Sequence, residues 1–339
     1  MKAIIPQPPL LQQSQTWQQA LSEMVTCPHT LLTMLDLDPM TVPWQWDQGF
    51  PLRVSKSFIS RMQKGNPFDP LLLQVLSTPI ESQLDKAFSC DPLEESDYNP
   101  VPGLLHKYPS KVLLTFTSSC AIHCRYCFRR HFPYQSNNPG RKGWDSALDY
   151  IRSHNEIVEV ILSGGDPLMA NDESIKLFIQ QLQNIPHIKI LRIHTRLPVV
   201  IPERINHALI SNLSSSRFSV VLVYHINHPN EIISSIAQGV LRLKQHNITV
   251  LNQSVLLKGV NDSLVCLKNL SISLFEAGIL PYYVNLLDPV QGSKHFFVDI
   301  VKARQLQQDL RAALPGYLVP KFVQEMPHRL SKTALDLIP

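Results

Sequence analysis

Short apolar runs alternate with amphipathic segments between residue 112 and about residue 290. The runs are rich in Val, Ile and Leu, as is typical of strands buried in a parallel sheet. Six of them can be placed, at 112–117, 158–162, 188–193, 218–223, 248–251 and 280–286. Between the later runs, segments 230–245 and 263–276 keep apolar residues at helical spacing. The alternation predicts an α/β fold with a parallel sheet covered by helices.

The number of these units favours an open barrel. Six units occupy about 180 residues, whereas a complete eight-unit barrel takes about 250. We therefore expect a partial, six-stranded β/α barrel of the TIM type. The regions on either side lack the alternation, apart from one more helical pattern at 299–314. Three parts are predicted: a helical N-terminal section, 1–105; the partial barrel, 106–297; and a C-terminal helix and tail, 298–339.

The N-terminal section shows only short helical patterns. The first follows Ser14, a candidate N-cap, and places Trp17 and Leu21 on one face. The polar stretch 89–102 is interpreted as a linker loop. Its acidic residues are interpreted as solvated: Glu94, Glu95 and Asp97. Nothing in this section suggests chemistry.

Polar residues follow each of the six apolar runs. In chain order they are a cysteine loop, Ser163 to Asp166, His194 to Arg196, His225, Gln253 and Asp288. Barrel enzymes collect their chemistry at the C-terminal ends of the strands. The sequence therefore predicts a single site at that end of the barrel.

Composition excludes several classes of partner. The 31 basic and 27 acidic side chains give a net charge of +4 with no long basic run, so nucleic acid is not a favoured partner. No apolar run approaches the roughly 20 residues that span a bilayer. The start, Met1 to Pro6, lacks the apolar stretch of a signal peptide. We therefore expect a cytoplasmic protein with reduced thiols, where clustered cysteines bind metals or catalyse.

Three of the six cysteines form the most specific motif. Cys120, Cys124 and Cys127 are spaced C-x3-C-x2-C directly after the first predicted strand. A structural zinc site normally closes with four ligands, so zinc would need His123 or His131 as well. A four-iron cluster held by three cysteines instead leaves one iron open for a substrate or cofactor. Outside the motif lie three isolated thiols, interpreted as buried or incidental: Cys27, Cys90 and Cys266.

This motif, with Tyr126 and Phe128 beside its last cysteine, resembles the radical S-adenosylmethionine (SAM) superfamily. From about residue 100 to the C-terminus the chain resembles the lysine 2,3-aminomutase family more closely. The similar stretches are 105–130, 162–168, 194–198 and 252–262. Within that family the chain is most similar to the branch that makes (R)-β-lysine for modification of elongation factor P.

The resemblance implies three cofactors. The three cysteines would hold a [4Fe–4S] cluster, whose open iron binds SAM. Gly164, Gly165 and Asp166 match the element that contacts the methionyl amino group, although on sequence alone they also suit an ordinary turn after a strand. Lys332 matches the lysine that carries pyridoxal phosphate. The family's glycine run before that lysine is absent here, which puts the local backbone shape in question.

The resemblance also assigns substrate contacts. Asp288 and Glu325 match the two acids that hold the distant ammonium of the substrate, with Glu325 where the lysine-type pattern has Asp. Arg129 matches the arginine that binds the substrate carboxylate, a task suited to a bidentate fork. Its neighbour Arg130 competes for that role.

The implied function is an isomerase, a lysine 2,3-aminomutase that converts free L-lysine to β-lysine, expected as the R isomer. The product would pass to a lysyl-tRNA synthetase-like ligase that modifies elongation factor P. A homo-oligomer is an option, since related aminomutases are oligomeric. The alternatives are a glutamate-type 2,3-aminomutase, a radical SAM enzyme without pyridoxal phosphate, and a non-catalytic metal-binding or scaffold protein. Asp288 and Glu325 argue against a substrate with an acidic side chain.

Overall fold

A computed structural model describes residues 16–137 and 140–338 of the chain. All six predicted strands are present and pair in parallel, in chain order. They are β2 (Lys111–Thr117), β3 (Glu159–Gly164), β4 (Ile190–Thr195), β5 (Ser219–His225), β6 (Thr249–Val255) and β7 (Leu280–Asn285). The partial barrel is therefore confirmed.

Three further strands make the sheet larger than predicted. β1 (Leu104–Tyr108) pairs antiparallel with β2, and β8 (Lys321–Gln324) continues the parallel run beside β7. β9 (Thr333–Ala334) pairs antiparallel with β8. The result is a nine-stranded sheet in the order β1 to β9. In the described part of the chain its two edge strands do not pair with each other, so the barrel stays open.

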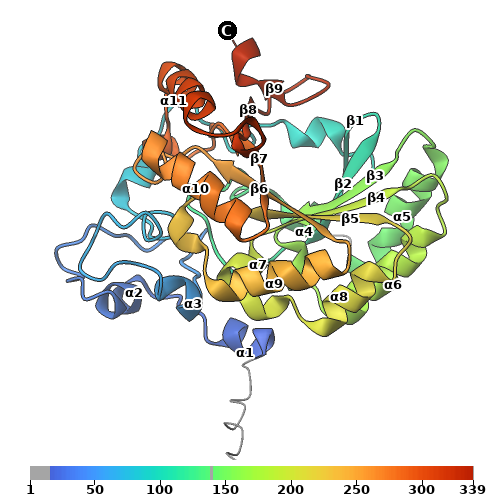
Figure 1. The fold of residues 1–339 in the computed structure, drawn as a ribbon, viewed down its shortest axis with the longest axis horizontal. Helices are drawn as coiled ribbons and strands as arrows, with labels where there is room; N and C mark the ends of the chain where they lie inside the picture. Colours follow the sequence, from blue (N-terminus) through green and yellow to red (C-terminus); the bar gives the residue numbers. More distant parts are fainter. Residues whose placement is uncertain (1–15, 138–139, 339) are drawn as a thin grey trace, which may run out of the picture.

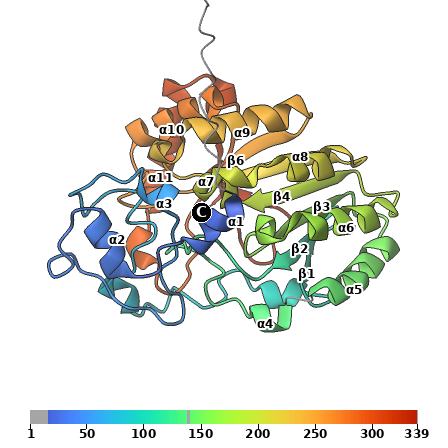
Figure 2. The same ribbon diagram turned by 90° about the horizontal axis from the view of Figure 1, so that it is seen from below.

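Helices cover the outer side of the sheet (Figures 1 and 2). The long ones are α5 (Gly140–Ser153), α6 (Asp172–Gln183), α8 (His207–Ser214), α9 (Ser234–Gln245), α10 (Leu264–Glu276) and α11 (Ile300–Ala313), and two short helices, α4 (Tyr134–Asn137) and α7 (Leu197–Val200), follow the cysteine loop and β4. Several begin at residues whose side chains accept a hydrogen bond from the third residue beyond, as N-caps do. These caps are Asn171, Asn206, Ser263 and Asp299.

The N-terminal section packs onto one end of the barrel (Figure 1, blue). Its helices are α1 (Trp17–Ser22), α2 (Pro28–Met34) and α3 (Lys56–Ile59). Thr16 caps α1 with its side chain, so the choice of Ser14 was wrong; Ser14 and the chain start lie outside the described residues. Buried residues of this section, such as Leu72, share one hydrophobic cluster with the barrel. The boundaries at 105 and 297 stay a prediction.

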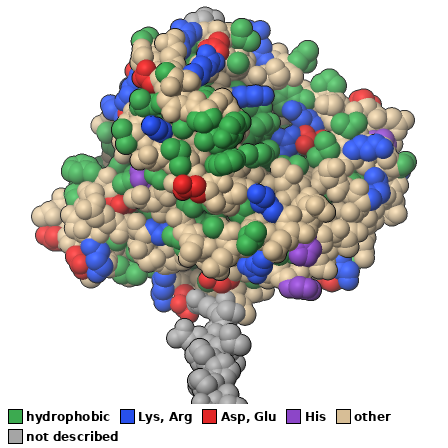
Figure 3. Space-filling view, viewed as in Figure 1, with side chains coloured by type: hydrophobic (Ala, Val, Ile, Leu, Met, Phe, Trp, Pro, Cys, Tyr) green, Lys and Arg blue, Asp and Glu red, His purple; other side chains and the backbone are tan. Residues whose placement is uncertain are grey.

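The surface mixes both signs of charge. Figure 3 shows Lys and Arg side chains interspersed with Asp and Glu, around hydrophobic side chains gathered near the middle of that face. This distribution agrees with the small net charge of the sequence. Within the described residues, the structure holds no helix with the length and apolar character that a membrane span requires.

Candidate active site

One cavity of about 400 Å³ lies inside the barrel. All ten site residues predicted from the sequence line it: Cys120, Cys124, Cys127, Arg129, Gly164, Gly165, Asp166, Asp288, Glu325 and Lys332. The other polar residues predicted at the strand ends line it too, namely Ser163, His194, Thr195, Arg196, His225 and Gln253. The structure therefore brings together residues that lie near the two opposite edges of the sheet. Their roles in catalysis and binding stay predictions.

The cysteine loop turns sharply after β2, where the backbone N–H of Cys127 donates to the carbonyl of Cys124 at 3.0 Å. In the described part of the chain, the three sulfurs do not all lie within 4.8 Å of one another. Ligands of one zinc ion would, because Zn–S bonds of about 2.3 Å place the sulfurs about 4 Å apart. The arrangement of the three thiols around one cavity therefore does not suit a single zinc ion.

Burial changes the acidity of two of these thiols. Burial, followed by the charge on Cys124, raises the pKa of Cys127 to about 11. Burial, followed by the charges on Asp166 and Cys127, raises the pKa of Cys120 as well. Burial therefore disfavours the free thiolates of Cys120 and Cys127, and a coordinating metal would supply the positive charge that stabilises them.

The two histidines of the zinc alternative have other partners. The Nδ1 atom of His123 lies 2.7 Å from the carbonyl of Pro51, and its ring stacks on Phe50. The Nε2 atom of His131 lies 3.4 Å from the carbonyl of Gln291. Neither histidine lines the cavity, which argues against a zinc site completed by either one.

Gly164 and Gly165 allow the end of β3 to approach the cysteine loop. Gly164 has a φ of 107°, and a Cβ atom on Gly165 would lie 2.5 Å from the carbonyl oxygen of Ser119. No larger residue fits there without moving the backbone. The N–H of Gly165 donates to the carbonyl of Thr117 at 2.8 Å. The two glycines thus fix the position of the cysteine loop.

Asp166 ties β3 to the end of β4. Its two carboxylate oxygens accept four hydrogen bonds, from the N–H groups of Leu168, Arg196 and Leu197 and from the Thr195 hydroxyl, at 2.7–3.0 Å. The side chain is therefore committed to the protein. Its expected contact with a cofactor would have to come from the remaining atoms of this turn.

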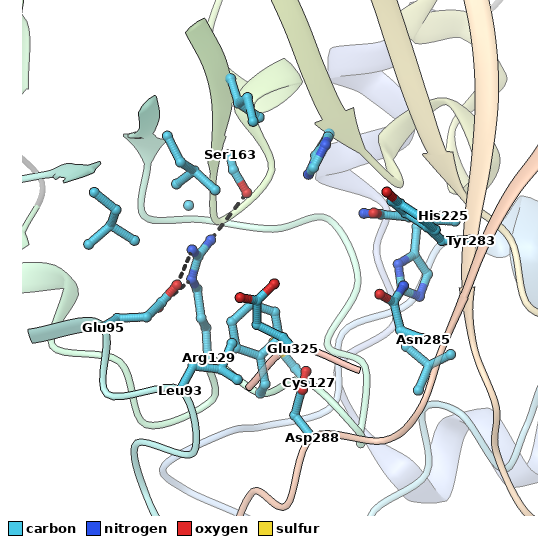
Figure 4. Close-up of a pocket in the computed structure, with 18 of the residues that line it drawn as sticks. Leu93, Glu95, Cys127, Arg129, Ser163, His225, Tyr283, Asn285, Asp288 and Glu325 are labelled. Atoms are coloured by element: carbon cyan, nitrogen blue, oxygen red, sulfur yellow. Dashed lines mark hydrogen bonds and ion pairs between the residues drawn. The ribbon is translucent and has the colours of Figure 1, made fainter. Parts of the chain in front are cut away.

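Arg129 reaches into the cavity, and Glu95 holds it there (Figure 4). Its Nε and Nη2 atoms donate to the two oxygens of Glu95 at 2.8 and 2.6 Å, and Nη1 donates to Ser163 Oγ at 3.1 Å. The neighbouring Arg130 turns away to Glu81 and Asp47, both at 3.1 Å. Of the two arginines considered for a carboxylate, Arg129 is thus the one in the cavity.

The interpretation of Glu95 as a solvated acid was wrong. Glu95 lies in a 3₁₀ turn (Glu95–Tyr98), and its side chain is only 14% exposed. The pattern of the surrounding stretch is polar, so it gave no signal for this contact. The available signal was indirect: a buried arginine requires an acidic partner.

Glu95→Gln is expected to lower the free energy of unfolding by about 3 kcal/mol, since it leaves the buried Arg129 without its counter-charge. Denaturant titration measures the loss. Glu94→Gln is the matched control, because Glu94 pairs with His328 at the surface and exposed pairs contribute roughly 0–1 kcal/mol. Equal losses in the two variants would contradict this account of Glu95.

Lys332 lies among acidic and amide groups at the other edge of the sheet. Its Nζ atom donates to Asn285 Oδ1 at 3.0 Å and pairs with Glu325 Oε2 at 3.3 Å. Although the glycine run is absent, His328 adopts a left-handed φ of 57° in the turn before the lysine. The N–H of His328 donates to the Tyr98 hydroxyl at 3.0 Å, which helps to hold this unusual conformation.

Glu325 is already paired, whereas the Asp288 side chain has no hydrogen bond or ion pair with any residue that the structure describes. The Oε1 atom of Glu325 accepts from Lys107 Nζ at 2.7 Å and from the Tyr108 hydroxyl at 2.5 Å. Burial alone would raise the pKa of Glu325, but Lys332 and these two contacts hold it below its usual value. For Asp288, burial dominates and raises the pKa to about 7, opposed by Lys332. Of these two acids, Glu325 is therefore the ionised one, and Asp288 titrates near neutrality.

Comparison with known proteins identifies the relatives of this chain. Residues 114–265 match the family model of the radical SAM superfamily. The chain is 48% identical to an L-lysine 2,3-aminomutase of Haemophilus influenzae, over 97% of this chain and 98% of that protein. It is 48% identical to an L-lysine 2,3-aminomutase of Escherichia coli, over 95% of this chain and 94% of that protein.

Among solved structures, a radical SAM methyltransferase from Sphaerobacter thermophilus is 19% identical and covers 65% of this chain and 68% of its own, with a TM-score of 0.45. The two aminomutases are matched almost end to end and at much higher identity. The similarity of this chain to the two aminomutases therefore shows the family to which it belongs. This chain belongs to the L-lysine 2,3-aminomutase family of radical SAM proteins.

Proposed function

We propose that this protein is a radical SAM, pyridoxal phosphate-dependent aminomutase that converts free L-lysine to β-lysine. The observation that carries the proposal is the cavity itself. It brings the three cysteines of the loop after β2 together with Lys332, from the opposite edge of the sheet. When bound, the cluster and SAM supply a carbon radical that abstracts hydrogen, and pyridoxal phosphate supplies the carbonyl group that takes up an amine.

The chain's own residues bind and orient the substrate. Arg129 offers a charged fork for the α-carboxylate, and the pair with Glu95 fixes its direction. Asp288 and Glu325 provide negative charge for the ε-ammonium. Lys107 and Lys332 already neutralise Glu325, so Asp288 is the acid more open to a new cation.

The acids also separate this proposal from the glutamate-type alternative. A substrate carboxylate in place of the ε-ammonium would face Asp288, the acid without a paired cation, and like charges in a buried site repel. His194 and His225 offer no compensating charge, because burial lowers the pKa of both, that of His225 to about 3. Lysine is therefore the favoured substrate.

The ratio kcat/KM for lysine is expected to fall about tenfold per pH unit below pH 7, because protonated Asp288 no longer attracts the ammonium. The charged groups that act on Asp288 are Lys332, Glu325, Glu95 and Lys107. In Asp288→Asn this acid limb should vanish, and kcat/KM should be low at every pH. An unchanged limb in Asp288→Asn would assign the titration to another group.

Anaerobic reconstitution tests the proposal directly. The protein is loaded with iron, sulfide and pyridoxal phosphate, then given reductant, SAM and either lysine or glutamate. NMR is expected to detect β-lysine from lysine only. Deoxyadenosine without any change in lysine would refute the substrate, and a colourless protein that binds no SAM would favour a scaffold. Absence of borohydride-trapped cofactor would favour the radical SAM enzyme without pyridoxal phosphate.

The finer assignments rest on the resemblance to one branch of the family. On that support we propose the R isomer as product, and its transfer by a lysyl-tRNA synthetase-like ligase to elongation factor P. Chiral derivatisation of the product tests the isomer. A cytoplasmic location and a homo-oligomer belong to the same proposal, and size-exclusion chromatography with light scattering tests the latter.

A further inference from the structure

Arg196 lies directly after β4 and points its charge at the cysteine loop. Its Nη1 atom donates to the sulfur of Cys124 at 2.7 Å and to the Tyr126 hydroxyl at 2.6 Å. The arginine is 6% exposed, and its backbone N–H is held by Asp166. A guanidinium in this position meets a sulfur that the cavity geometry assigns to a metal cluster.

A buried network keeps Arg196 in this orientation. Its Nη2 atom donates to Gln74 Oε1 at 2.6 Å and to Glu231 Oε2 at 3.0 Å. Glu231 is fully buried, and its other oxygen accepts from the N–H groups of Asn227 and His228 at 2.9 and 3.0 Å. The pair therefore cannot rotate away without leaving a buried charge unpaired, which is costly.

The network extends into the N-terminal section. The Gln74 side chain also donates from Nε2 to Glu231 at 3.2 Å, and the backbone carbonyl of Gln74 accepts the N–H of Arg125 at 2.9 Å. Arg125 lies between Cys124 and Cys127 in the sequence. The section that showed no chemistry in its sequence thus supports both the cysteine loop and the arginine behind it.

We infer that Arg196 sets the reduction potential of the iron–sulfur cluster, by holding a fixed positive charge against the Cys124 sulfur. This inference rests on the proposed ligation of the cluster by the cysteines. Hydrogen bonds and net charge at the sulfurs are among the properties that tune such clusters. The positive charge of Arg196 stabilises an electron added to the cluster, and the negative charge of Glu231 destabilises it. Arg196 acts through Cys124, so it is a positioning and tuning residue.

The charge of Arg196 is permanent. Burial alone would lower its pKa, but the charges on Cys124, Tyr126 and Glu231 raise it well above the usual value. Neutralising either member of the Arg196–Glu231 pair should therefore shift the potential, and in opposite directions. A role in folding alone predicts no such change of sign.

Redox titration of the reconstituted protein, followed by the EPR signal of the reduced cluster, tests the inference. In Arg196→Met, the ratio of reduced to oxidised cluster at a fixed potential is expected to fall about tenfold, equivalent to about 59 mV for a one-electron couple. In Glu231→Gln, which keeps the shape of the side chain, the ratio is expected to rise. Arg196→Lys retains the charge and should restore most of the wild-type ratio.

Arg204→Met is the matched control. Arg204 is also fully buried and pairs with Asp172 at 2.8 Å, but it makes its hydrogen bonds to the backbone of Leu168 and Ala170 rather than to a cysteine. Its loss should lower stability without moving the potential. Equal shifts in Arg196→Met and Arg204→Met, or shifts of the same sign in Arg196→Met and Glu231→Gln, would overturn the inference.

The outcomes also separate this inference from the proposed function. If the wild-type protein assembles no cluster, measured as iron and sulfide per chain, the assignment of the cysteines fails and the inference fails with it. If the cluster assembles and deoxyadenosine forms, but the potential of Arg196→Met equals that of the wild type, the inference alone is overturned. If Arg196→Met does not fold, the upward shift in Glu231→Gln decides the matter.

Discussion

Lys332→Ala is expected to abolish the trapping of pyridoxal phosphate by borohydride and to lower the rate of β-lysine formation by about 10³-fold or more. A covalent carrier needs an amine that can lose its proton inside the cavity. Lys332 is placed for this by Asn285 and by the pair with Glu325. Peptide mapping after borohydride reduction locates the label, and NMR measures the product.

Two other lysines line the described cavity, and neither is expected to carry the borohydride label. Lys107 is held by Glu325 at 2.7 Å and by the carbonyl of Met326 at 2.9 Å. The ammonium of Lys111 lies 4.5 Å from the centre of the Tyr108 ring. Lys111→Gln should therefore retain the label on Lys332. A label on Lys107 or Lys111 in the wild-type protein would contradict the assignment of Lys332.

The strands that were predicted and those that were missed differ in burial. β2 to β6 carry Val, Ile and Leu side chains that pack in one large hydrophobic cluster. β8 has four residues and β9 only two, at the edge of the sheet. Such short segments carry no periodicity, and they become strands only because β7 offers a partner to β8 and β8 offers one to β9. The pattern thus revealed the central strands of the barrel and missed its edges.

The site shows the same division between local and tertiary information. The cysteine spacing and the glycines are local, so the chain itself carries that signal. Glu95 and Gln74 reach the site from the N-terminal section, and their positions depend on how that section packs on the barrel. Arg196 was placed at a strand end, but its contact with Cys124 depends on the turn that Asp166 holds. Partners of buried charges were therefore out of reach for the sequence pattern.

Cys120→Ala is expected to abolish deoxyadenosine formation while leaving pyridoxal phosphate trapped at Lys332. A cluster held by three thiolates loses a ligand and its open iron is no longer presented to SAM. Lys332 makes its contacts with Asn285 and Glu325, which come from β7 and from the segment after β8, not from the cysteine loop. Iron content and EPR measure the cluster, and chromatography measures deoxyadenosine.

The isolated cysteine of α10 supplies the control for that experiment. The Cys266 thiol lies 3.7 Å from the Val260 carbonyl and does not line the cavity. Cys266→Ala should therefore keep both cluster and activity. Loss of both cofactors in Cys120→Ala, with an altered near-ultraviolet circular dichroism spectrum, would mean that the loop also shapes the fold. That outcome is disfavoured because the loop's backbone is held independently of the cysteine side chains, by Gly165 and Asp166 through Thr117 and Ser119.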